Sequence, residues 1–155
     1  MAPLFQHIIT LIARMMIGLY FIVTGALSIA DWNGKAGNIA AKLGFLEGTI
    51  GEAGTTATSH TLLAIAIGVA LIGGLSVVIG LRARVGAVLL IIFLAPATII
   101  MHNFWAVSAG QMQGEVLIFL KNVALLGGVL MVLAFGPGGL SADLILPRRR
   151  QMGQF

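Results

Sequence analysis

Residues 116–135, VLIFLKNVALLGGVLMVLAF, decide the fold, because this apolar run of 20 residues contains a single charge, that of Lys121. As an α-helix it would be about 30 Å long, the thickness of the hydrocarbon core of a bilayer. The run stops at Gly136–Pro137–Gly138–Gly139, a sequence that ends helices. The stretch therefore predicts a transmembrane helix with a defined end.

Three further apolar runs precede this one, so we expect transmembrane helices near 8–30, 61–81, 85–105 and 115–135. Only Arg82–Arg84 separates the second run from the third, which predicts a tight antiparallel hairpin. One long helix would place two arginines at mid-span, where charges are costly. The 155 residues are expected to form a single domain, an all-α membrane protein with a four-transmembrane-helix bundle.

The composition excludes a water-soluble domain and several classes of site. The chain is 59% hydrophobic and 9% charged, whereas soluble domains carry about 25% charged residues. Membrane lipids are therefore the expected surroundings. The net charge of +4 does not indicate nucleic-acid binding, because the basic residues lie at the ends of apolar runs. The absence of cysteine excludes disulfides and thiolate metal ligands, and we expect no metal site.

The loop between the first and second runs is the only long connection. Residues 36–46 place Ile39, Leu43 and Leu46 at helical spacing, which predicts a short helix lying in the membrane interface. The following stretch, residues 48–59, is rich in glycine and threonine and is expected to be irregular.

Basic residues predict the orientation of the bundle. Arg82, Arg84 and Arg148–Arg150 fall on one side, and Lys35 and Lys42 fall on the other. Cytoplasmic segments carry the excess of lysine and arginine. Both termini and the Arg82–Arg84 turn are therefore expected in the cytoplasm, and the membrane is expected to be a bacterial inner membrane.

Charged residues inside the apolar runs are the candidates for function, because a bilayer makes them expensive. Arg14 lies two turns into the first run, in the cytoplasmic half of the membrane. We expect it to bind Asp143 or the carbonyls of Gly136–Gly139. A structural clamp is the favoured role for Arg14 and Asp143, with a ligand contact as the alternative.

A second polar cluster is expected in the outer half. Lys121 would meet His102 and an acid, either Glu115 or Asp31, and Asn122 continues the polar stripe of Glu115 seven residues on. Histidine changes protonation near neutral pH, which makes His102, Lys121, Glu115 and Asn122 the candidate functional set. The alternative reading is structural: Glu115 favours a helix N-terminus, and the cations pair within the bundle.

The sequence also resembles the DoxX family of small four-helix membrane proteins over nearly its whole length. The resemblance is carried by Ala13-Arg14, Gly18-Leu19-Tyr20-Phe21, Thr24-Gly25-Ala26, Gly73-Gly74-Leu75, Gly80-Leu81, His102-Asn103-Phe104-Trp105, Lys121-Asn122, Gly127-Gly128 and Gly136-Pro137-Gly138-Gly139-Leu140-Ser141-Ala142-Asp143. It implies a membrane subunit linked to redox and sulfur chemistry, with Arg14, His102, Lys121 and Asp143 as the functional polar residues.

Three functions follow from these observations. The first is an accessory subunit of a larger redox-linked membrane complex, with other membrane-protein subunits as partners and no catalysis of its own. The second is a quinone-interacting oxidoreductase subunit, in which Lys121 or His102 donates a hydrogen bond to a quinone carbonyl. The third is a small-molecule permease, which four short helices could form only as an oligomer. A haem held by His60 and His102 is not favoured, because neither residue lies well inside a helix.

Overall fold

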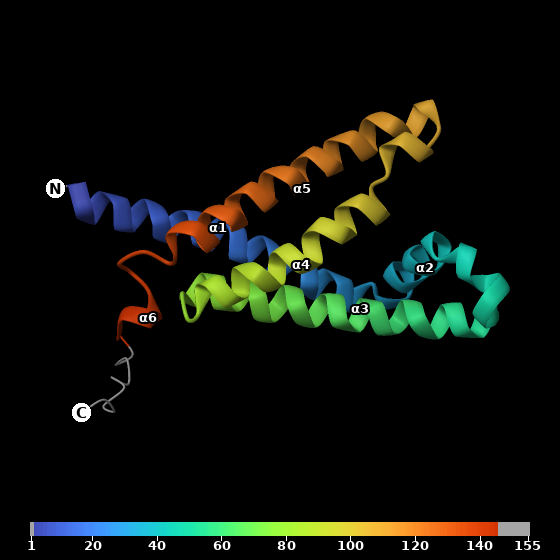
Figure 1. Ribbon diagram of the computed structural model, residues 1–155, viewed down its shortest axis with the longest axis horizontal. Coiled ribbons are helices and arrows are strands. Elements are labelled where there is room, and N and C mark those ends of the chain that lie inside the picture. The colour runs from blue at the N-terminus through green and yellow to red at the C-terminus, as the bar shows by residue number, and fades with distance from the viewer. Residues whose placement is uncertain (1, 146–155) are drawn as a thin grey trace, which may run out of the picture.

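The computed structural model describes residues 2–145, whose regular elements are all helices joined by short turns (Figure 1). Its elements are α1 (Ala2–Ala30), α2 (Trp32–Lys42), η1 (Gly44–Leu46), α3 (Glu47–Ile79), α4 (Ala83–Met101), η2 (Phe104–Ala106), α5 (Ala109–Phe135) and α6 (Ala142–Ile145). Four stretches are long and apolar enough to cross a membrane: Leu4–Ala30, Gly44–Ile79, Ala83–Ala106 and Ala109–Phe135. The predicted all-α bundle with four transmembrane helices is confirmed. Arg148–Arg150, used above for the orientation, lie outside the described residues.

A tight turn joins α3 to α4, as the three-residue spacing predicts. The helix α3 ends at Ile79, Gly80 adopts φ 74°, and Arg82 adopts φ 47° just before α4 begins at Ala83. Positive φ suits glycine and is uncommon for arginine. The Asp143 carboxylate accepts a hydrogen bond of 2.9 Å from the Arg82 backbone N–H, which helps to hold that conformation. The two arginines therefore lie at a helix end and not at mid-span.

The prediction of an irregular segment at residues 48–59 is wrong. The segment is helical and extends α3 to Glu47, with one backbone break at Gly51, where φ is 72°. Each glycine lowers helix stability by about 1 kcal/mol, but packing overrides propensity. Thr55 and Ser59 are buried and donate to the carbonyls of Gly51 and Thr56, so their hydroxyl groups are satisfied within the helix.

The short helix in the first loop begins four residues earlier than predicted, at Trp32, and ends at Lys42. It folds back over α3, where its buried Ala36 packs against Leu63 and Ile67. The indole N–H of Trp32 donates to His60 at 2.7 Å, which ties the start of α2 to α3. The position of α2 in the membrane interface stays a prediction.

Glycines set the close helix contacts of the bundle. A Cβ atom placed on Gly74 of α3 would lie 2.9 Å from the carbonyl oxygen of Gly18 on α1. A Cβ atom on Gly86 of α4 would lie 3.0 Å from the carbonyl oxygen of Gly73. Real side chains do not fit at these distances, so glycine allows the backbones of α1, α3 and α4 to approach one another.

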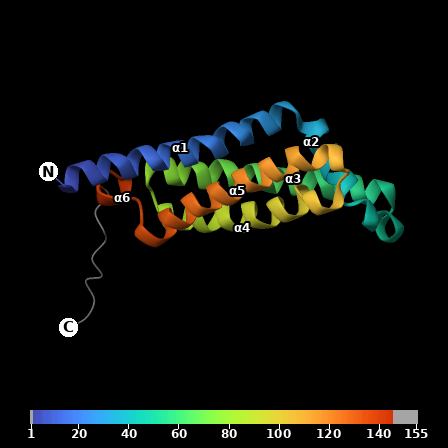
Figure 2. The same cartoon turned by 90° about the horizontal axis from the view of Figure 1, so that it is seen from above.

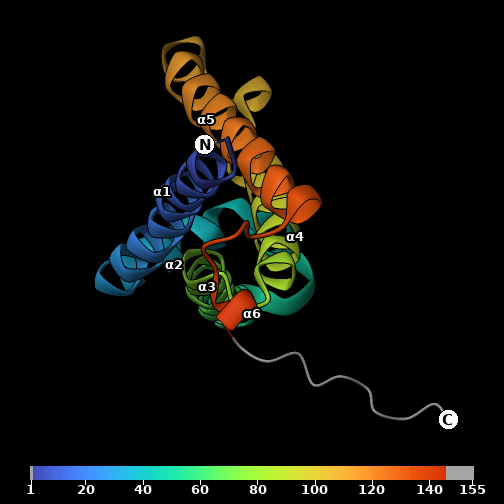
Figure 3. The same cartoon turned by 90° about the vertical axis from the view of Figure 1, so that its left-hand side faces the viewer.

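The bundle has two distinct ends. The N-terminus, the α3–α4 turn and α6 lie together at one end, hereafter the α6 end, and α2 lies at the other, hereafter the α2 end (Figure 2). The helices α1 and α5 cross toward the α6 end, where Ile17 approaches Gly128, and then diverge toward the α2 end (Figures 1 and 3). The bundle is therefore closed at one end and splayed at the other.

Candidate functional site

A cavity of about 640 Å³ lies at the α2 end, lined by residues of α1, α2, α3, α4 and α5. Ligand sites in proteins fall in the range of about 300–1,000 Å³. Aliphatic and aromatic side chains from α1, α3 and α4 form most of its wall, including Phe21, Leu63, Ile67, Phe93 and Leu94. The cavity is partly open, on a bundle whose α1 and α5 diverge at this end. Its shape and lining suit an apolar molecule.

The polar residues of the wall are strongly biased in charge. They include Lys35, Asn38 and Lys42 from α2, His102 after α4, and Lys121 and Asn122 from α5. These three lysines are the only lysines in the sequence. No aspartate or glutamate is among the described residues that line the cavity. The cavity is therefore apolar along most of its wall and carries cationic groups on α2 and near the middle of α5.

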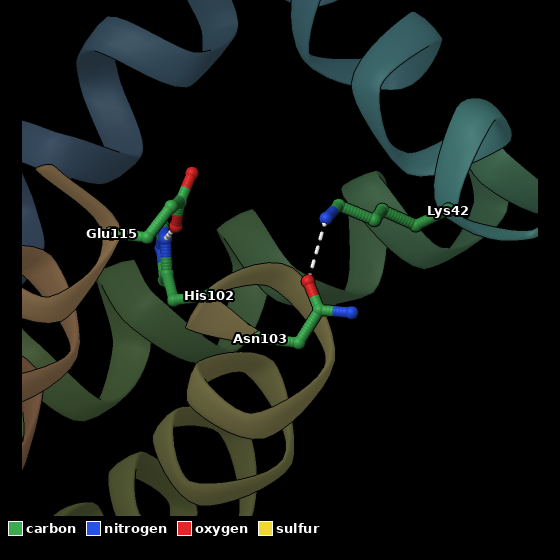
Figure 4. Close-up of polar contacts among 4 residues, drawn as sticks. All are labelled: Lys42, His102, Asn103 and Glu115. Carbon is green, nitrogen blue, oxygen red and sulfur yellow. Dashed lines mark hydrogen bonds and ion pairs between the residues drawn. The ribbon is translucent and has the colours of Figure 1, made fainter. Parts of the chain in front are cut away.

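The α2 residues reach the cavity because of their spacing. Lys35, Asn38 and Lys42 follow one another at three and four residues, which places them on one helix face, while Ala36 faces α3. The Lys42 ammonium group donates to the Asn103 side-chain carbonyl at 2.9 Å, bridging α2 to the end of α4 (Figure 4). The sequence reasoning treated these lysines only as orientation signals, and their spacing is the pattern that would have placed them on the site.

Two neighbouring residues of α5 border the cavity without strong partners. The Lys121 ammonium nitrogen lies 5.3 Å from the centre of the Tyr20 ring, a cation–π contact. The Asn122 side chain is only 7% exposed, yet it makes no hydrogen bond to any described residue. Because Asn122 lines the cavity, its amide is free to hydrogen-bond a molecule that enters it.

His102 and Glu115 are hydrogen-bonded at the rim of the cavity. The His102 Nδ1 and Glu115 Oε2 atoms are 2.9 Å apart, and the two side chains are 27% and 28% exposed. Figure 4 shows this pair beside the separate Lys42–Asn103 bond. The contact joins the end of α4 to the first turns of α5, so it braces the connection through η2.

The predicted cluster therefore forms only in part. His102 meets Glu115, and Asn122 lies in the same cavity wall, but Lys121 meets Tyr20 and no carboxylate among residues 4–143. Asp31 is exposed and takes no part in an ion pair there. His60 accepts a hydrogen bond from Trp32 and is not paired with His102. In the described chain, no group of three or more histidine or acidic residues could hold a metal ion.

Arg14 organises the α6 end. Its side chain is 1% exposed, and the two guanidinium NH₂ groups donate to the carbonyl oxygens of Pro137 and Leu140, at 2.5 and 2.7 Å. Asp143 accepts from the backbone N–H of Arg82 and not from the guanidinium group. The His7 Nδ1 atom accepts from the Gly139 N–H at 3.0 Å. The segment from Gly136 to α6 is thus tied across the end of the bundle, at the turn expected from the sequence.

Comparison with known proteins corrects the family assignment. The model of the SURF4 family matches residues 36–145, most of the chain. The inner membrane protein YphA of Escherichia coli (strain K12) is 27% identical over 140 residues, covering 89% of this chain and 90% of YphA. No solved structure matches. The DoxX resemblance is therefore wrong: half of its motif residues are glycines and other small residues, which many membrane bundles share because helices pack closely through them.

Proposed function

We propose, from the premise that this chain belongs to the SURF4 family, that it is an inner-membrane protein that binds a lipophilic molecule in the cavity at its α2 end. The similarity to an inner membrane protein of Escherichia coli supports the location. The cavity of about 640 Å³, apolar along most of its wall with cationic groups on α2 and α5, is the observation that carries the binding role.

The route of entry follows from the helix arrangement. The cavity is partly open, and α1 and α5 diverge toward the α2 end (Figure 3). These two observations support lateral entry of a molecule dissolved in the bilayer. Pro96 and Ile92 lie in the wall, and proline leaves the carbonyl four residues earlier, that of Ile92, without its helical donor. That carbonyl is a further acceptor for a bound polar group.

The experiment fills the cavity and measures what co-purifies. Ala66 and Ala97 line the cavity on α3 and α4, and phenylalanine at both positions would occupy it. Ala13→Phe, on the exposed face of α1 near the α6 end, is the matched control. Lipids and other small molecules are extracted after purification in mild detergent and identified by mass spectrometry.

We expect a defined lipophile with the parent protein and the Ala13→Phe control, and its loss from the Ala66→Phe/Ala97→Phe protein. If the filled variant retains the same molecules in the same amounts as the parent, the molecules are annular and the binding role is refuted. A folded elution profile and an unchanged helical circular dichroism spectrum are required of each variant.

A role as an accessory subunit remains a separate proposal, compatible with ligand binding. The redox link rested on the DoxX resemblance and loses its support with it. Quinone stays a candidate ligand, because Lys121 and His102 border the cavity and either could donate to a carbonyl. The permease alternative is not favoured, because the segment tied by Arg14 covers the α6 end of the bundle. Membrane proteins that co-elute stoichiometrically would support the subunit role.

A further inference from the structure

The geometry points to an anionic amphiphile as the ligand of this cavity, with its acidic head bound by Lys42, Lys121 and Asn122 and its apolar chain along the wall of α1, α3 and α4. This inference rests on the proposed binding function and names the chemical class of its ligand.

Positive charge is concentrated around the cavity. All three lysines of the sequence line the cavity, while Arg14, Arg82 and Arg84 lie at the α6 end. Among the described residues, no acidic side chain lines the cavity to neutralise the lysines. Glu115 is the nearest acid along α5, and it is engaged by His102 at the rim. The site therefore offers net positive charge to whatever enters it.

Lys121 lies far along α5 and has no charged partner among the described residues. It lies 12 residues after Ala109, the first residue of α5, which places it about 18 Å along the helix. A cation at that depth requires a counter-ion or a polar partner. Its contact within the described chain is the face of the Tyr20 ring, which attracts a cation but carries no charge to balance it. An anionic head group would supply the missing counter-ion.

Asn122 and Lys42 offer further hydrogen-bonding groups to a ligand. The Asn122 side chain is more than nine-tenths buried, lines the cavity beside Lys121 and has no hydrogen-bond partner among residues 4–143. An amide offers both donors and acceptors, so it can bind the oxygen atoms or the hydroxyl group of an acid. Lys42 is held only by the neutral amide of Asn103, which leaves its positive charge uncompensated and two of its donors free of protein partners described here.

The apolar wall completes the match. Leu62, Ile65, Ile92 and Ile100 line the cavity and have exposed apolar side chains. An inorganic anion would leave this surface empty. A neutral hydrocarbon would leave the lysines without partners. A molecule with an acidic head and one alkyl chain satisfies both parts, whether the head is a carboxylate, as in a free fatty acid, or a phosphate, as in a lysophospholipid.

The test compares probes that differ only in charge. Protein depleted of lipid in a neutral detergent is titrated with a saturated fatty acid and with the fatty alcohol of the same length, above the pH at which the acid ionises. A second pair, lysophosphatidic acid and the corresponding monoacylglycerol, distinguishes a phosphate head from a carboxylate. Ubiquinone is the neutral redox-active comparison. Dissociation constants come from calorimetry or native mass spectrometry.

We expect at least one acid to bind about tenfold more tightly than its neutral partner, equivalent to ~1.4 kcal/mol. Lys121→Gln and Lys42→Gln should each remove most of that preference, so that the acid and its neutral partner bind with similar affinity. Arg84→Gln, which removes the same charge at the α6 end, is the matched control and should change neither value. If Lys121→Gln does not fold, Lys42→Gln on the half-exposed α2 face provides the same measurement.

The outcomes separate this inference from the proposed function. Equal affinity for acid and alcohol, or tightest binding of ubiquinone, overturns the anionic ligand but leaves a lipophile-binding cavity. A preference that Arg84→Gln reduces as much as the lysine variants also overturns it, because the effect would then come from net charge. Failure of every probe to bind would overturn the proposed function itself.

Discussion

Removal of the Arg14 side chain tests whether the α6 end is held as the structure indicates. Arg14→Met keeps a long flexible side chain but removes the donors to Pro137 and Leu140. Each carbonyl left without a donor costs about 1–3 kcal/mol in a dry site, while hydrogen bonds within membrane bundles average about 0.6 kcal/mol. Because both hydrogen bonds are only partly buried, we expect a total loss of about 2–3 kcal/mol.

Arg14→Lys sharpens this prediction. Lysine keeps the charge but cannot reproduce the planar fork that reaches two carbonyls at once. One of the two bonds should be lost, so the variant should fall about midway between the parent and Arg14→Met. The assay is reversible unfolding in mixed detergent micelles, with the free energy of unfolding extrapolated to the native condition.

Limited proteolysis provides the second measurement. If Arg14 ties down the segment that begins at Gly136, protease should cut that segment in Arg14→Met long before it cuts the transmembrane helices. Free energies of unfolding within about 0.5 kcal/mol of the parent for both variants, together with an unchanged cleavage pattern, would refute the clamp. The ligand affinity at the α2 end should stay the same, because the two sites lie at opposite ends of the bundle.

Three further predictions concern packing, the rim and the orientation. Gly74→Val should separate α1 from α3 and destabilise the bundle by about 1–3 kcal/mol, whereas Gly127→Ala, where a Cβ atom would meet nothing within 4 Å, should be tolerated in the same thermal melt. Glu115→Gln should lower the free energy of unfolding by less than about 1 kcal/mol, because its contact with His102 is partly exposed. A larger loss would show that this contact is essential to the α4–α5 connection. The chain has no cysteine, so single cysteine replacements can report its orientation in the membrane. Ser108→Cys should react with an impermeant thiol reagent in intact cells, whereas Leu81→Cys should react only after the membrane is opened. The reverse pattern would show that the predicted topology is inverted.

Much of the fold was predictable because it depends on local signals. The length of the apolar runs gave the four helices, and the spacing of Arg82 and Arg84 gave the hairpin, since charges cannot lie at mid-span. The predicted helix boundaries were less accurate than the number of helices where glycine and threonine are frequent. Residues 48–59 have weak helical propensity, but buried side-chain bonds at Thr55 and Ser59 allow the helix to continue.

The site was less predictable because it depends on how helices diverge. The sequence singled out Lys121, His102 and Asn122, and all three line the cavity. It could not show that Lys121 lies over Tyr20, because that contact depends on where α1 crosses α5. Lys35 and Lys42 were visible as a spaced pair, but only the folding of α2 back over α3 brings them to the cavity.

The tie across the α6 end has a consequence for biosynthesis. Pro137 follows its partner Arg14 by 123 residues, so at ribosomal speeds of about 5–20 residues per second the first helix waits roughly 6–25 s for its acceptors. During that interval the nascent helix carries an unmatched cation, which the insertion machinery or the lipid surface must shelter. A message truncated after the codon for Phe135 would make that state permanent, and we expect its product to be degraded by membrane quality-control proteases much faster than the complete protein.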